Sequence, residues 1–238
     1  AATANVYAGV ISFVDLQGNF DGIAILLLLA AMAVKRAVWV GLLVFAACWT
    51  DERAVAASGS VLVWWLLLRK AAPAATIALA CCLYLASRRA LMHSFAWIHV
   101  VEDPLFLFRN FLYQFNLVPI GLWTGLEGLW LIVLMAARHL WRSNKGLMAC
   151  YGCVIALIAF QALTIGDLTR SMAYLFPATL IALKVLAENE SRFELRRWLL
   201  ISALACLLWP TYIVGYKSSI WWTYPLPLQC LRWALGGL

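Results

Sequence analysis

The sequence predicts an all-α integral membrane protein, a polytopic helical bundle with about eight membrane-embedded helices plus interfacial segments. Hydrophobic residues make up 65% of the 238 residues and charged residues only 12%, whereas soluble proteins have roughly 45–50% apolar and about 25% charged residues. Apolar runs follow one another along the chain, and most of them end at charged residues. We therefore expect a single transmembrane domain over residues 1–238, without a separate soluble domain.

The net charge of +7 is spread over short loops, where basic residues set the orientation of a protein in the membrane. This distribution indicates no nucleic-acid partner. The sequence begins at Ala1 rather than at a methionine. That start indicates either a processed protein or the C-terminal part of a longer chain.

The first half of the chain contains short apolar runs. After a polar turn at residues 15–20, the runs cover residues 21–34, 37–49, 54–68 and 71–87. Several have only about 13–17 residues, below the roughly 20 that a full membrane span requires. We expect either a thin membrane around these helices or polar helix ends buried in a protein cavity.

The second half begins with a segment of a different kind. Residues 88–116 mix basic, acidic and histidine residues with many aromatic rings, which is typical of an interfacial or re-entrant segment. The predicted spans after it cover residues 117–137, 146–165, 172–187 and 198–215. The tail, residues 216–238, is predicted to be interfacial.

The basic loops predict the orientation of the helices. If residues 35–36, 69–70, 138–145 and 188–197 lie on the inner side, every helix alternates in direction. Eight of the eleven acidic residues then lie on the outer side or inside the membrane: Asp15, Asp21, Asp51, Glu52, Glu102, Asp103, Glu127 and Asp167. This placement predicts an acid-rich outer cavity and is the main functional indication in the sequence.

Asp167 and Arg170 lie three residues apart between two apolar runs. The pair could neutralise itself on one helical turn. Alternatively, Arg170 binds an anionic group such as a lipid phosphate, because a guanidinium matches phosphate geometry. Arg88 and Arg109 could serve the same surface.

Glu127 is predicted to be a buried polar residue, because it lies within an apolar run. It either faces a cavity and pairs with Arg170 or a histidine, or is a protonated carboxyl bonded to a neighbouring helix. Gly125 and Gly128 permit the close helix approach that the second alternative needs.

Two further groups have weaker functional interpretations. His93, His99, Glu102 and Asp103 are weak candidates for a divalent cation site, since their spacing matches no established metal motif; otherwise no cofactor is predicted. Residues 51–53 are interpreted as the N-cap of the following helix in preference to a catalytic group. No GxSxG, HExxH, P-loop or GxGxxG motif is present.

Two stretches carry a family resemblance. One runs from Gly18-Asn-Phe-Asp21 through Lys35-Arg36 and the Trp39 run to Asp51-Glu52-Arg53-Ala54; the other is Asp167-Leu-Thr-Arg170 with Pro177. Over residues 15–70 and 160–185 the sequence resembles polytopic GT-C-type membrane glycosyltransferases and related exopolysaccharide proteins. The resemblance implies a polyprenyl-phosphate-linked sugar donor, chemistry at the outer membrane face, an acidic residue as base and arginines that hold the lipid phosphate.

This resemblance gives the leading functional hypothesis. The candidates for the base are Asp15, Asp21 and Asp167, and those for lipid-phosphate binding are Arg170, Arg109 and Arg88. The expected partners are membrane lipid and a lipid-linked sugar, in the bacterial inner (plasma) membrane. The alternative is a non-enzymatic subunit that packs against a membrane protein partner. A transporter ranks last, because the sequence has no convincing internal repeat.

Overall fold

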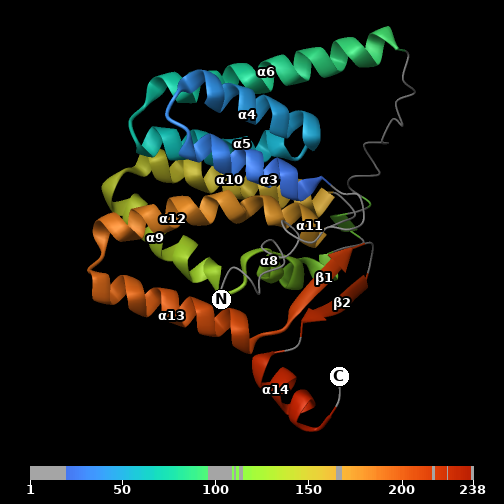
Figure 1. Ribbon diagram of the computed structural model, residues 1–238, viewed down its shortest axis with the longest axis vertical. Helices are drawn as coiled ribbons and strands as arrows, with labels where there is room; N and C mark the ends of the chain where they lie inside the picture. Colours follow the sequence, from blue (N-terminus) through green and yellow to red (C-terminus); the bar gives the residue numbers. More distant parts are fainter. Residues whose placement is uncertain are drawn as a thin grey trace.

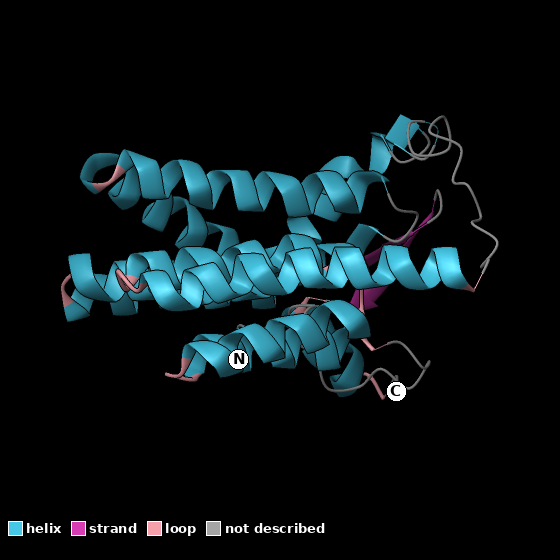
Figure 2. Ribbon diagram, turned by 90° about the horizontal axis from the view of Figure 1, so that it is seen from above, coloured by secondary structure: helices cyan, strands magenta, loops and turns pink. Residues whose placement is uncertain are grey.

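The protein is a bundle in which most of the long helices run side by side, with a small hairpin at one end, as the computed structural model shows (Figures 1 and 2). The structure describes residues 20–95, 109, 111–112, 115–164, 168–215, 218–223 and 225–236. The helical prediction is thus confirmed, and the hairpin is an addition to it.

The first half forms four consecutive helices: α3 (Asp21–Ala33), α4 (Ala37–Thr50), α5 (Ala54–Leu67) and α6 (Ala71–Ser94). Two indole groups lock α5 onto the end of α3. Trp64 Nε1 donates to the Met32 carbonyl at 2.9 Å, and Trp65 Nε1 donates to the Ala31 carbonyl at 3.1 Å. The carbonyls at a helix end lack partners within their own helix, so these bonds also satisfy buried backbone groups.

The second half contains these elements: η1 (Phe115–Leu117), α8 (Val118–Leu126), α9 (Leu129–Ser143), α10 (Lys145–Thr164), α11 (Leu168–Met172), η2 (Ala173–Leu175), α12 (Phe176–Asn189), α13 (Arg192–Leu208), β1 (Thr211–Gly215), β2 (Ser218–Thr223) and α14 (Leu226–Ala234). In the apolar 18-residue stretch of the helix over Leu168–Asn189, 67% of the residues are buried, against 28% in that of α6 and 17% in that of α10. This helix therefore forms the centre of the bundle, and α6 and α10 lie at the periphery.

The lengths of the helices correct the predicted number of spans. Three helices in the described part of the chain are long and apolar enough to cross a membrane, and a fourth span results if α8 and α9 count together. Helices α3, α4 and α5 have 13 or 14 residues, about 20 Å at 1.5 Å per residue, whereas a bilayer core is about 30 Å thick. Eight membrane-embedded helices are therefore not supported.

Two of the predicted spans are wrong in detail. The run over residues 117–137 is broken after Leu126, and its two helices are bent by 83°. The run over residues 198–215 is not one helix, because α13 ends at Leu208 and Thr211–Gly215 pairs in antiparallel register with β2. In the predicted interfacial segment, α6 continues as a helix to Ser94, and most of residues 96–114 lie outside the described ranges.

The surface of the bundle carries many exposed large apolar side chains, including Leu79 and Leu83 on α6, Leu157 and Phe160 on α10 and Leu200 on α13. Such a surface is unfavourable in water and suits hydrocarbon. With the candidate spans, it defines a helical membrane protein.

Candidate functional site: a charged network at one end of the bundle

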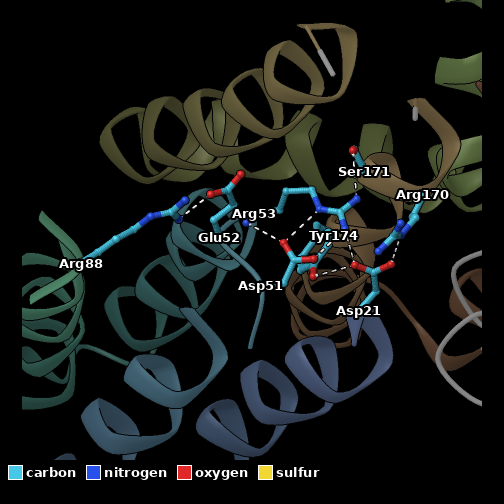
Figure 3. Close-up of polar contacts among 8 residues, drawn as sticks. All are labelled: Asp21, Asp51, Glu52, Arg53, Arg88, Arg170, Ser171 and Tyr174. Carbon is cyan, nitrogen blue, oxygen red and sulfur yellow. Dashed lines mark hydrogen bonds and ion pairs between the residues drawn. The ribbon is translucent and has the colours of Figure 1, made fainter. Parts of the chain in front are cut away.

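Four separate parts of the chain bring ionised side chains together at the end of the bundle that carries the hairpin. We call this group the charged network; it consists of Asp21, Asp51, Glu52, Arg53, Arg88, Arg170, Ser171 and Tyr174 (Figure 3). It contains three acidic and three basic residues, so its charges balance. Segments predicted to lie on the outer side of the membrane thus meet, but as paired charges rather than as an acid-rich cavity.

Arg53 is the centre of the network. It precedes α5, and its guanidinium Nη2 lies 2.5 Å from Asp21 Oδ1 and 2.6 Å from Asp51 Oδ2. Its Nε donates to Asp51 Oδ1 at 3.0 Å and its Nη1 to Ser171 Oγ at 3.3 Å. The ring of Tyr174 packs on the same guanidinium, 5.3 Å from its carbon to the ring centroid, a favourable cation–π distance. Arg53 therefore joins α3, the turn before α5, α11 and η2.

Asp21 is held between two arginines. It is the first residue of α3, where a carboxylate is favoured by the helix dipole. Its side chain is 0% exposed and accepts hydrogen bonds from Arg53, from Arg170 Nε and, at 3.2 Å, from the Tyr174 hydroxyl. Arg170 is the more accessible of the two arginines, with a side chain that is 22% exposed against 10% for Arg53.

The turn between α4 and α5 shows how the network stabilises its charges. Burial by itself would raise the pKa of Asp51, but hydrogen bonds and charge from Arg53 outweigh it and lower that pKa to about 2. The same contacts raise the pKa of Arg53 above its ordinary value, although burial opposes this. Both groups are therefore fully ionised at neutral pH.

Residues 51–53 do precede α5, as the capping interpretation requires. The Asp51 side chain accepts the backbone N–H of Arg53 at 2.8 Å. The main role of residues 51–53 is to form ion pairs, however, because the side chains of Asp51 and Arg53 belong to the charged network. These partners could not be predicted from the sequence, since Asp21 and Arg53 are 32 residues apart and Asp21 and Arg170 are 149 apart.

Arg88 forms the exposed arm of the network. Its Nη1 pairs with Glu52 and donates to the Tyr84 hydroxyl at 2.5 Å, and the side chains of Arg88 and Glu52 are 39% and 56% exposed. Arg88 thus lies at the same end as Arg170, in the solvated part of the network, where its partner is Glu52.

The other predicted site residues are not placed in the network. Arg109 is exposed, and His93 is exposed in the last turn of α6. Five candidates lie outside the described residues: Asp15, His99, Glu102, Asp103 and Asp167. Among the residues that the structure describes, no group of three His, Cys, Asp or Glu side chains could hold a metal ion.

Glu127 lies in the break between α8 and α9 and is 0% exposed. Of its two predicted alternatives, pairing with Arg170 or a histidine is not seen among the described residues. Its Oε1 accepts a hydrogen bond from the hydroxyl of Thr211, at the start of β1, and Arg170 is bound to Asp21 instead.

The fold and the charged network define the chain as a helical membrane protein with an ion-paired cluster at one end. Comparison with known proteins assigns it no family: no family model, curated protein or solved structure matches the chain.

Proposed function

We propose that the protein is a membrane glycosyltransferase-like enzyme that uses a polyprenyl-phosphate-linked sugar donor at the end of the bundle that carries the charged network. The observation that carries this proposal is the Asp21 carboxylate held between the guanidinium groups of Arg53 and Arg170. A carboxylate and a phosphate oxygen bind a guanidinium in the same geometry. Two arginines arranged around one anion therefore suit a phosphate.

Arg170 is the residue that would contact the donor. Its partial exposure lets a phosphate approach it from the surface, whereas Arg53 is enclosed by Asp51, Ser171 and Tyr174. The reaction breaks the bond between the anomeric carbon and the phosphate oxygen, and leaves negative charge on that oxygen. Arg170 stabilises this charge, as positioned cations do in other transferases.

The acceptor hydroxyl attacks the anomeric carbon and loses its proton to a carboxylate. Asp15, Asp21 and Asp167 remain the predicted bases. Asp21 is fully buried and bonded to three side chains, which fits a positioning role toward Arg170. As the base it would first have to exchange one of these partners for the acceptor.

The expected setting is the bacterial inner membrane, with membrane lipid and the lipid-linked sugar as partners. The short helices α3, α4 and α5 support this setting. Because they provide only about 20 Å of apolar length, the charged network at their ends would lie close to the lipid headgroups. A phosphate attached to a membrane lipid lies at that depth.

The test uses the purified protein in lipid nanodiscs with polyprenyl-phosphate-linked donors that carry a labelled sugar. Arg170→Ala is expected to lower transfer by about 10²–10³-fold, the usual cost of losing one group that stabilises developing charge. Arg170→Lys is expected to recover only part of the rate, since lysine lacks the bidentate fork. Lys184→Ala is the matched control, because Lys184 pairs with Glu188, four residues further along α12. Unchanged transfer by Arg170→Ala would overturn the proposal.

One observation favours the alternative, a non-enzymatic subunit of a membrane assembly. Helix α14 presents Leu228, Leu231 and Trp233 with exposures of 42%, 53% and 76%, and it stands away from the bundle in Figure 1. Exposed apolar side chains on a helix that stands away from the bundle suit a membrane protein partner. Under this alternative the purified complex has a fixed second component that Trp233→Glu releases, and the chain alone transfers no sugar.

A further inference from the structure

The break between α8 and α9 places Glu127 inside a bent span. Glu127 adopts a φ of 46°, in the left-handed region that non-glycine residues rarely occupy. The break is held by its own hydrogen bonds: the Glu127 N–H donates to the Trp123 carbonyl at 2.6 Å, and Trp130 Nε1 donates to the Leu122 carbonyl at 2.7 Å. Strained backbone of this kind persists where the surroundings fix it, and it concentrates at functional sites.

Close contacts with neighbouring segments fix the break. A Cβ added to Gly128 would lie 2.2 Å from the Ser202 carbonyl on α13, and one added to Gly125 would lie 2.8 Å from Met172 Cε on α11. Both glycines therefore allow helix contacts that a larger residue would prevent. The Glu127 side chain is held in the interior and cannot turn outward without moving these helices.

The carboxyl group of Glu127 is only half satisfied. Oε1 accepts the Thr211 hydroxyl, whereas Oε2 is buried and has no hydrogen-bond partner among the described residues. Trp123 Nε1 and Ser202 Oγ are likewise buried and have no hydrogen-bond partner among the described residues. A carboxylate ion in such surroundings lacks the positive charge or donors that would compensate its desolvation.

No cation in the described structure is aimed at Glu127. On the elements that pack against the break, Arg170 and Tyr174 bind Asp21, and His139 binds Glu190. The titratable group that interacts with Glu127 is the thiol of Cys206 on α13. The remaining ionisable residues of these elements are Tyr212 on β1, Arg138 and Arg142 on α9, and Arg192, Glu194, Arg196 and Arg197 on α13.

We propose that Glu127 is a proton-binding site within the membrane, with an exchangeable proton on its carboxyl group at neutral pH. The protonated carboxyl keeps the Thr211 hydrogen bond on one oxygen and avoids a buried, unpaired charge. Trp123 on α8 and Ser202 on α13 carry further buried polar atoms without partners among the described residues, and water bound to such atoms would let the proton exchange. This inference is independent of the proposed transferase activity.

Infrared difference spectroscopy of the whole protein in nanodiscs tests it. At pH 7 the wild type is expected to show the carbonyl stretching band of a protonated carboxylic acid, and Glu127→Gln is expected to lose it. The band should shift in D₂O, because the proton exchanges, and Thr211→Val should shift its frequency through the lost hydrogen bond. Glu188→Gln, at an exposed pair on α12, is the matched control and should keep the band.

Two results would overturn the proposal. One is a wild-type spectrum without the band, which would mean an ionised Glu127. The other is a band that does not shift after prolonged exposure to D₂O, which would mean a fixed structural proton. If Glu127→Gln does not fold, the Thr211→Val frequency shift assigns the band, and an unchanged frequency in that variant counts against Glu127.

Discussion

Arg53 offers the sharpest test of how the bundle is held together. Arg53→Ala removes the ion pairs to Asp21 and Asp51 and the bond to Ser171 in one step. Asp21 is fully buried and keeps only Arg170 and Tyr174. Removing one partner from a buried ion pair typically costs about 3–5 kcal/mol, because the other charge stays buried.

A cost of that size corresponds to a fall in melting temperature of roughly 10 °C for a chain of this length. The assay is thermal unfolding of the purified protein in one detergent, followed by intrinsic tryptophan fluorescence. Arg88→Ala is the comparison, since the exposed pair of Arg88 with Glu52 should contribute only about 0–1 kcal/mol. Adding Asp51→Asn to Arg53→Ala should restore part of the loss, because Asp51 pairs with Arg53 and would otherwise keep an uncompensated charge, whereas Asp21 still pairs with Arg170.

Equal melting temperatures for Arg53→Ala and Arg88→Ala would refute this reasoning. They would mean that the charged network is solvated in the membrane protein and contributes no more than a surface pair. A further loss on adding Asp51→Asn to Arg53→Ala would also contradict it.

Two other predictions follow from the geometry. The pKa of Asp51 is about 2 in the folded protein and 3.8 in the unfolded chain. Ionised Asp51 therefore adds about 2 kcal/mol to the free energy of unfolding above pH 3.8, and this stabilisation is lost as the pH falls toward 2. Asp51→Asn should therefore be less stable than the wild type at pH 6 and nearly equal to it near pH 2, in melts across that range; a constant difference would contradict the assignment. Gly128→Ala should lower the melting temperature or prevent folding, because its Cβ would lie 2.2 Å from the Ser202 carbonyl. Gly152→Ala, whose Cβ would meet only Met148 Cε at 3.9 Å, should stabilise α10 by about 0.5–1 kcal/mol. A lower melting temperature for Gly152→Ala than for Gly128→Ala would refute the packing argument.

The helices, and which of their charged ends lie at the same end of the bundle, could be predicted from the sequence because both depend on local hydrophobicity and charge. Apolar runs closed by charged residues correspond closely to α3, α4 and α5. The end of α13 also had a local signal, since Pro210 follows it and Thr211-Tyr-Ile-Val214 is rich in residues that favour strands. The predicted span over residues 198–215 overlooked that signal.

The charged network could not be predicted in the same way. Residues 51–53 have the pattern of a helix start, and nothing near them indicates a partner such as Tyr174. Pairing across 32 and 149 residues depends on how the helices pack. The break at Glu127 had only the flanking Gly125 and Gly128 as a signal, and glycines there are equally compatible with an unbroken span.

The sequence separations within the charged network also constrain how the protein is made. Asp21 is synthesised before either of its arginines, which follow 32 and 149 residues later. During translation α3 therefore begins with an unpaired carboxylate until Arg53 emerges, and that carboxylate gains its second cation only when Arg170 arrives. The complete set of ion pairs around Asp21 can thus form only late in biogenesis, after most of the chain has been synthesised.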